Sequence, residues 1–387
     1  MVEYPGLPHL IKQAVKNYLT VSFESIKLDG LLEVDRLIGL EGFIENSDAD
    51  ILHLILSGAG VVDVESRLLL PVNTIDRASS LVVLSYNVCG GTSDRIIELA
   101  VSVHLIFCAA GIFDDIQDQD KKYSLSSKVG TGKALNIGLL LLLLGQIQLN
   151  KTLEQLLLTN SGVHKKNFKD TISNSKPFLL PNKLVQNLIF GIRGQLLDLQ
   201  ENVLPLETQL TIPSYFESKN GLKAALMFSY LAELGAIAGN CAGSTSEIYR
   251  EFGFLFGMIT QLLSDLGDFL LIKSEQGNSS RDLGQRKITL PFIYACQAKS
   301  YEERRHFAQL LEMTPIPLLE ISEFLKESVA VSRTIEQIAH YLVLAENTLR
   351  KVDPLLEHQE HQVMISMLHQ FMQPLQSSFQ EALKFSE

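Results

Sequence analysis

Long apolar stretches at helical spacing, with almost no strand signal, constrain this chain more than any other feature. The stretch 94–113 is almost wholly apolar after its first turn, and 183–200, 222–240, 246–272 and 329–352 follow the same three- and four-residue spacing. Helices that are apolar on every side belong in a protein interior. We therefore expect an all-α chain, folded as one bundle of ten or more helices.

Composition narrows the class of protein. Hydrophobic residues make up 46 % of the 387 residues, enough for a large core, and the formal net charge of −11 argues against broad nucleic-acid binding. The cysteines, Cys89, Cys108, Cys241 and Cys296, lack metal-ligand spacing and are expected to be buried free thiols in a reducing compartment.

No membrane or export signal stands out. The N-terminal residues lack a basic region followed by a long apolar stretch, and the longest apolar run, 137–145, is too short to cross a bilayer. We expect a cytoplasmic protein with no transmembrane segment. Loops are expected where Gly, Pro, Ser and Asn gather, at 57–73, 118–132, 161–182, 203–213 and 273–284.

The first acidic cluster, DDIQDQD, ends the apolar stretch before it. Asp114 and Asp118 share a helical face at i and i+4, and Asp115 lies beside them. Three carboxylates at a helix C-terminus repel each other and the helix dipole, so something positive should offset them. Hard oxygen ligands with no His or Cys nearby favour Mg²⁺ over zinc. A solvated acidic helix end is the competing interpretation.

The second cluster, QLLSDLGD, lies inside another apolar helix and places Gln261, Ser264, Asp265 and Asp268 on one face. Buried carboxylates need partners, and two such rows can satisfy each other through shared metal ions and a polyanion such as a diphosphate. A diphosphate also needs cations, and the candidates on or beside the flanking helices are Arg193, Lys219, Lys223, Arg281, Arg286 and Lys287.

These parts indicate a reaction. Metal ions and cationic side chains stabilise a departing diphosphate, and the allylic cation left behind must be kept from water in an apolar pocket. The helix before the first cluster offers a wall of Val101, Leu105, Ile106, Cys108, Ala109 and Ala110.

Two other motifs are set aside. The segment GTGKA at 130–134 resembles a phosphate loop, but Ser127 stands where that loop needs Gly and Ala134 lacks a metal-binding hydroxyl. The segment EHQEH at 357–361 has no known zinc-protease spacing, and we expect a solvated helix face there.

Five segments in order resemble the trans-prenyl diphosphate synthase family: DDIQD, GQLLDL, the stretch containing SKNGLKAA, QLLSDLGD and DLGQRKITLP. ALNIGLLLL adds a sixth, similar to a buried family helix. The resemblance is clear from about 94 to 298. It implies an all-α isoprenoid-synthase fold around a central cavity over 1–387, with divergent N-terminal helices at 1–75 and a terminal helix or tail at 375–387. It further implies three Mg²⁺ ions, an allylic isoprenoid diphosphate substrate and a homodimer.

The resemblance also assigns roles by motif. It implies that Asp114, Asp115, Lys219, Gln261 and Lys287 are catalytic. The implied metal ligands are Asp114, Asp115, Asp118, Asp265 and Asp268. The implied substrate contacts are Arg77, Ala109, Ala110, Gln195, Lys219, Lys223, Gln261 and Lys287, with Lys219 and Lys223 rivals for the phosphate-binding lysine.

The departures from the family concern mainly the second substrate. No GGKR-x-RP segment precedes the first cluster, and only Arg67 or Arg77 can stand in for it. Lys121 and Lys122 replace an arginine pair, and lysine does not reproduce the bidentate arginine fork. Ser264 replaces the first Asp of the second motif. The allylic half of the site is thus retained, while the isopentenyl diphosphate half is eroded.

Three functions remain open at this stage. The first is a prenyltransferase acting on isopentenyl diphosphate or another acceptor, such as a peptide. The second is a terpene synthase that cyclises or hydrolyses the same substrate. The third is a non-catalytic partner subunit. Prenyl transfer fits the overall pattern best. Because Ala109 and Ala110 are small and the next floor candidates are Ile106 and Phe107, we expect the pocket to take about fifteen carbons or more.

Overall fold

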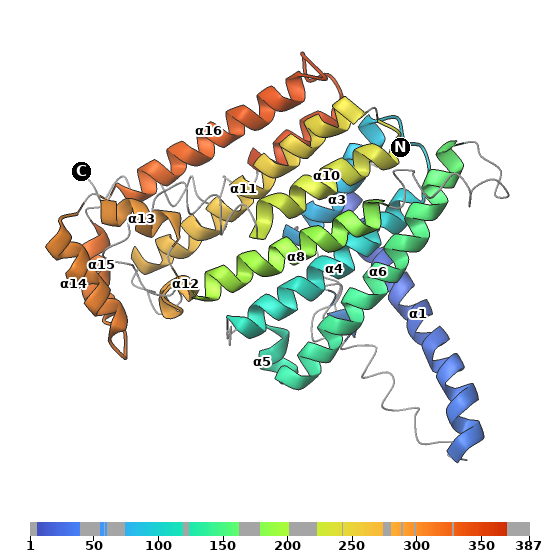
Figure 1. Cartoon of the computed structure of the whole chain (residues 1–387), viewed down its shortest axis with the longest axis horizontal. Coiled ribbons are helices and arrows are strands. Elements are labelled where there is room, and N and C mark those ends of the chain that lie inside the picture. The colour runs from blue at the N-terminus through green and yellow to red at the C-terminus, as the bar shows by residue number, and fades with distance from the viewer. Residues whose placement is uncertain are drawn as a thin grey trace. The chain divides into compact units, whose positions relative to one another are not determined.

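The computed structural model (Figure 1) describes residues 6–38, 55–57, 59, 74–118, 124–161, 179–200, 223–241, 243–273, 280–287, 289–297, 299–326 and 329–369. No strand occurs within these ranges, which confirms the all-α prediction. The chain forms two compact units, Met1–Pro181 and Asn182–Glu387, called unit 1 and unit 2. The single-domain assignment stays a prediction.

In unit 1, helix α4 (Ile96–Gln117) is central. It contacts α1 (Leu7–Ile38), α3 (Thr74–Val88), α5 (Leu125–Val129) and α6 (Thr131–Ser161). Its apolar residues therefore have neighbours on several sides, and twelve of its residues are buried. The predicted stretch 94–113 is this helix, extended by one turn through the acidic cluster.

In unit 2, helix α11 (Gly243–Lys273) has the same central role. It contacts α10 (Leu226–Ala238) and α16 (Ala330–Arg350), and also the shorter helices α12 (Arg281–Gly284), α13 (Leu290–Gln297) and α15 (Leu318–Lys326). Helix α14 (Tyr301–Glu312) packs on α15, and α8 (Leu179–Gln200) begins at the boundary of the units.

The predicted helices are confirmed, and the predicted loops need correction at three places. The range 118–132 contains α5, 161–182 includes the first residues of α8, and 273–284 ends in α12. Short helices without a full apolar period are hard to distinguish from loops by sequence pattern alone. Residues 203–213, most of 57–73 and the tail 375–387 lie outside the described residues.

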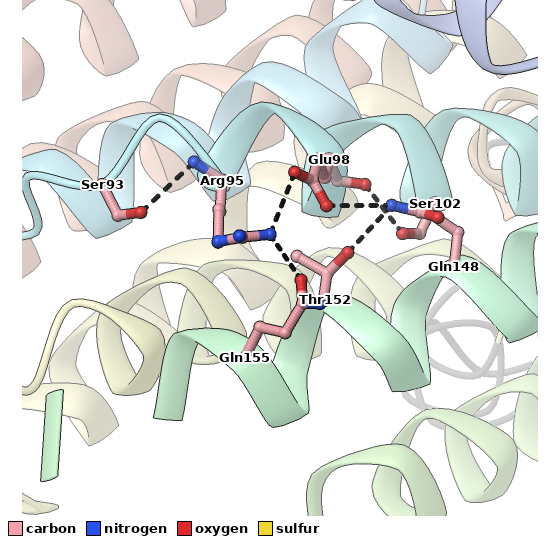
Figure 2. Close-up of polar contacts among 7 residues, drawn as sticks. All are labelled: Ser93, Arg95, Glu98, Ser102, Gln148, Thr152 and Gln155. Atoms are coloured by element: carbon pink, nitrogen blue, oxygen red, sulfur yellow. Dashed lines mark hydrogen bonds and ion pairs between the residues drawn. The ribbon is translucent and has the colours of Figure 1, made fainter. Parts of the chain in front are cut away.

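Polar contacts fix how α4 lies on α6 at the end of α4 away from its acidic cluster (Figure 2). The Arg95 guanidinium donates to Gln155 Oε1 at 2.5 Å and lies 3.4 Å from Glu98 Oε1. The Gln148 amide donates to Glu98 Oε2 at 3.3 Å and to Thr152 Oγ1 at 3.0 Å. Because Gln148 is buried, its bond to Glu98 holds the two helices in one register.

Two glycines of α11 allow α10 to approach it closely. A Cβ built on Gly253 would lie 2.3 Å from the Phe228 carbonyl oxygen, and one built on Gly257 would lie 2.6 Å from the Ala225 Cα. Only glycine allows the backbones to come this close. Gly267, on the same helix, has no atom within 4 Å of such a Cβ.

The segment 353–361 differs from the sequence expectation. His361 is only 1 % exposed, whereas a solvated face was predicted, although His358 is exposed as expected. The His361 ring lies 2.9 Å (Nδ1) from Asp353 Oδ2 and 3.0 Å (Nε2) from the Tyr249 hydroxyl. The contacts of His361 with Asp353 and Tyr249 therefore tie the segment after α16 to α11. Burial raises the pKa of Asp353, but hydrogen bonds from His361, His358 and Glu357 outweigh it and hold that pKa at about 2.

Two helices, α4 and the part of α6 from Thr131 to Leu156, are long and apolar enough to cross a membrane by length and composition. The apolar window of α4 is 67 % buried and that of α6 is 39 % buried. Core helices of soluble proteins meet the same criterion. The absence of a transmembrane segment stays a prediction.

Gly253→Ala should lower the midpoint of thermal unfolding, because the new methyl meets backbone at 2.3 Å and overpacking costs about 1–3 kcal/mol. Gly267→Ala is the matched control. It should raise the midpoint, since Ala in an open helical position gains about 0.5–1 kcal/mol over Gly. Circular dichroism measures both unfolding midpoints. Equal midpoints for the two variants would contradict the packing of α10 on α11.

Candidate active site

The first acidic row stands at the C-terminal end of α4. Asp114, Asp115 and Asp118 are all half-buried, and Asp118 is the C-cap residue, its N–H donating to the Asp114 carbonyl at 2.8 Å. The predicted placement of these carboxylates at a helix end is confirmed. Their negative charges add to that of the helix terminus, so the site favours a cation.

One turn before this row, the two small residues of α4 differ in exposure. Ala109 is fully buried in unit 1, whereas Ala110 is exposed and lies four residues before Asp114, on the same face. Ile106 packs towards α6, where a Cβ on Gly145 would lie 2.8 Å from its Cγ1. Phe107 is half-buried and lies three residues before Ala110. Ala110 and Phe107 are therefore the residues on the face of the acidic row.

The remaining predicted wall residues lie in the core of unit 1. Val101, Leu105 and Cys108 are at most 3 % exposed. Cys108 donates from its thiol to the Ala59 carbonyl at 3.2 Å. Their side chains are thus used in packing, and Ala110 alone of the six predicted wall residues is exposed.

Arg77 lies in the first turn of α3 and is half-buried. Burial lowers the pKa of its guanidinium to about 10, while the Asp76 carboxylate acts in the opposite direction. Asp76 itself forms a buried ion pair with Lys12 of α1, with Nζ–Oδ2 at 3.0 Å. Arg77 therefore keeps its positive charge at neutral pH, on a helix whose first turn is anchored to α1.

The second acidic row is confirmed as a polar stripe on α11, with one difference between its members. Asp265 is 4 % exposed and accepts a hydrogen bond from the Gln261 amide at 2.9 Å. Asp268 is half-buried, and Ser264 is exposed. Ser264, which replaces a family Asp, therefore lies outside the buried part of the stripe. Gln261 orients the buried carboxylate rather than standing free beside it.

Residues that follow α11 form hydrogen bonds with Asp268 of its second row. Asp268 Oδ2 accepts hydrogen bonds from the Ser280 hydroxyl at 2.5 Å and the Asp282 N–H at 3.1 Å. Lys287, five residues further, is 6 % exposed. Sequence reasoning treated 273–284 as loop and missed the contact of Ser280 with Asp268. The only signal for it was Ser280 before a short helix, a common N-cap position.

Gln195 on α8 has an unusual environment. Its amide N and O atoms are both buried and have no hydrogen-bond partner within the described residues. Helix α8 is held on α10 by Lys183, whose Nζ lies 2.8 and 3.0 Å from the two carboxylate oxygens of Glu233. Buried amides nearly always find a partner, so Gln195 fits a site where a ligand or water completes its bonding.

The other predicted cations include Lys223 and Arg193, whose side chains are described. Lys223 is half-buried in the single π-helical turn before α10, and Arg193 is exposed on α8. Lys219, Arg67, Lys121 and Lys122 lie outside the described residues, as does the side chain of Arg281. The choice between Lys219 and Lys223 stays open.

The described residues hold no group of three or more His, Cys, Asp or Glu side chains arranged to bind a metal by themselves. Mg²⁺ usually takes one or two carboxylates and completes its shell with water and phosphate oxygens. The half-buried Asp115 and the oriented Asp265 fit such a role.

Comparison with known proteins identifies the family. The family model described as polyprenyl synthetase matches residues 78–326, from α3 to the end of α15. The chain belongs to the polyprenyl synthetase family. The match includes both acidic rows, Gln195 and Lys287, which confirms the resemblance predicted from the motifs.

Individual relatives agree with this family. Component 2 of heptaprenyl diphosphate synthase from Bacillus subtilis is 29 % identical over 121 residues, which cover 31 % of this chain and 34 % of that relative. The heptaprenyl diphosphate synthase structure from Staphylococcus aureus superposes with a TM-score of 0.67 at 17 % identity, covering 96 % of this chain and 98 % of that one. A Caulobacter crescentus polyprenyl synthase, complexed with calcium and isoprenyl diphosphate, superposes with a TM-score of 0.60 at 20 % identity. The superposition covers 87 % of this chain and 96 % of that one. These structures establish the shared all-α fold.

Proposed function

We propose that this protein is a Mg²⁺-dependent prenyltransferase that ionises an allylic isoprenoid diphosphate and transfers the prenyl group to an acceptor. The observation that carries the proposal is the family match over residues 78–326, which spans both acidic rows. The relative from Caulobacter was crystallised with a divalent cation and an isoprenyl diphosphate, which supports this ligand class.

The residues have complementary roles in this proposal. Asp114, Asp115 and Asp118 on one helix, and Asp265 and Asp268 on the other, would hold Mg²⁺, with three ions expected. Bound Mg²⁺ supplies Lewis-acid stabilisation of the leaving diphosphate. Gln261 orients Asp265, and Lys287 adds a positive charge, with Lys219 or Lys223 as a second.

The acceptor is the open part of the proposal. Arg77 is positively charged and lies next to Asp76, which is paired with Lys12. We therefore propose that Arg77 binds the diphosphate of an acceptor. A terpene synthase would need no such cation, and the family match favours prenyl transfer over it. A non-catalytic subunit has no reason to keep five aspartates on two rows.

Cytoplasmic localisation is part of the same proposal. None of the four cysteines forms a disulfide bond. Cys108 and Cys296 are buried and Cys89 and Cys241 are half-buried, so two of the four are less buried than predicted. Burial raises the pKa of the Cys296 thiol to about 12, which keeps it protonated and unreactive. Cysteines without disulfide bonds are typical of a reducing compartment.

A product assay tests the proposal directly. Purified protein with Mg²⁺ is incubated with ten-, fifteen- and twenty-carbon allylic diphosphates, with and without isopentenyl diphosphate. A longer diphosphate supports prenyl transfer to isopentenyl diphosphate. A hydrocarbon or alcohol formed without a second substrate would replace the proposal with terpene synthesis, and an untouched set of substrates would refute catalysis on these compounds.

Asp115→Ala should abolish turnover while leaving the unfolding midpoint nearly unchanged, because it removes a half-buried metal ligand rather than core packing. EDTA should stop the parent enzyme, and added Mg²⁺ should restore it. Asn150→Ala, on the exposed face of α6, is the control and should keep full activity. Substantial turnover by the Asp115 variant would remove this residue from the site.

Ala110→Phe should shorten the product or the accepted substrate, because it places a ring on the exposed face that carries the acidic row. Ala109→Phe is the contrast, since this fully buried position has no room and the variant should lose stability instead. Chromatography of the products and thermal unfolding separate the two effects. A product profile in Ala110→Phe identical to that of the parent would defeat the pocket assignment.

We further propose a homodimer formed through α6. Leu135, Leu139, Leu143 and Ile147 are 44–61 % exposed and form one continuous stripe at four-residue spacing. Scattered single apolar residues are ordinary on a surface, but a continuous stripe is typical of an interface. A second copy fits such a stripe, since a two-fold axis across it pairs the same residues from both chains.

Leu143→Glu should convert the dimer to a monomer, because it places a charge in the middle of the stripe. Leu319→Glu is the matched control, since Leu319 is 84 % exposed on α15 and should not affect association. Light scattering after size-exclusion chromatography gives both masses. A monomeric parent protein, or a Leu143 variant that stays dimeric, would contradict this interface.

A further inference from the structure

Helix α12 is closed at its N-terminal end by the second acidic row. Ser280 precedes the helix, and its hydroxyl accepts from the Leu283 N–H at 3.2 Å while donating to Asp268 Oδ2 at 2.5 Å. The same Asp268 oxygen accepts from the Asp282 N–H at 3.1 Å. A carboxylate that accepts two donors at a helix start is a strong, charge-assisted cap.

The other end of α12 is closed by a Schellman arrangement. The Lys287 N–H donates to the Asp282 carbonyl at 2.8 Å, and the Arg286 N–H donates to the Leu283 carbonyl at 3.0 Å. Arg286 has a φ of 59°, the left-handed conformation that this cap requires and that usually selects glycine. Its guanidinium lies 3.3 Å from Thr314 Oγ1, which ties the turn to the segment after α14.

Asp282 joins these two ends. Its N–H is bonded to the Asp268 side chain and its carbonyl to the Lys287 N–H, so a single residue lies between the acid and the backbone of the cation. Ser280 is buried and Lys287 is 6 % exposed, so neither end is frayed by water. A displacement of Ser280 or Asp268 must therefore move Lys287.

The geometry points to Ser280 as a positioning residue that, with Asp268, holds Lys287 where it meets the diphosphate. This inference rests on the proposed function, because it takes Lys287 to be a diphosphate-binding cation. It assigns Asp268 a task that a metal ligand alone would not have, since its Oδ2 fixes α12. It also explains why α12 keeps Arg286 in a backbone conformation that costs energy.

A double-mutant cycle tests the inference on the full-length protein. The readout is the dissociation constant of inorganic pyrophosphate in the presence of Mg²⁺, measured by calorimetry, together with KM and kcat for an allylic diphosphate. Ser280→Ala should raise the dissociation constant of pyrophosphate about fivefold, the effect of a lost helix cap. In a Lys287→Ala background, the same substitution should have almost no further effect, because the group it positions is gone.

Two controls separate positioning from general stability. Ser280→Thr keeps the hydroxyl and should restore the parent affinity. Ser300→Ala removes the equivalent N-cap of α14, where Ser300 accepts from the Glu303 N–H at 3.3 Å, and should leave pyrophosphate affinity unchanged. KM should rise more than kcat falls in Ser280→Ala, which a uniform loss of folded protein would not produce.

Asp268 gives a second route if Ser280→Ala does not fold. Asp268→Asn keeps an oxygen acceptor for the Asp282 N–H and should retain clearly more pyrophosphate affinity than Asp268→Ala. Equal losses in these two variants, or an equal effect of Ser280→Ala with and without Lys287, would overturn the inference. A parent protein that binds no Mg²⁺–pyrophosphate would instead overturn the proposed function, so the two failures are distinguishable.

Discussion

Carboxylates carried by helices that are otherwise packed on apolar faces are the constraint on which the rest of this structure depends. Helix α4 contacts four other described helices and α11 contacts five, so each has few positions where a charge can lie. In both helices the acids occupy those positions, at the end of α4 and along one stripe of α11. Charge that is partly removed from water must be compensated, and an enzyme that binds cations and polyanions makes use of this need.

The two rows meet that need differently within their own units. Asp114, Asp115 and Asp118 are half-buried at a helix C-terminus, where the helix dipole opposes their negative charge. On α11, protein groups orient the acids in advance. The Gln261 amide holds Asp265, and Ser280 with the Asp282 amide holds Asp268. A carboxylate that is oriented in this way loses less freedom when a ligand binds to it.

The departures from the family pattern acquire a physical meaning in this setting. Ser264 replaces an aspartate at an exposed position of the stripe, so the buried acid of that row is unaffected. The chain thus keeps the aspartates of both acidic rows and Lys287.

The sequence by itself determined the helical class, the positions of the main helices and the two acidic rows, because each depends on local spacing along one helix. It also determined the family, through the order of several such segments along the chain. The periodicity that makes 94–113 and 246–272 helical also places Asp114 with Asp118 and Gln261 with Asp265. Only the tertiary structure decided which of Ala109 and Ala110 is exposed, that His361 is buried against Asp353 and Tyr249, and that Asp268 caps α12. These depend on contacts between segments eight or more residues apart, and the sequence pattern of one element does not specify what packs against it.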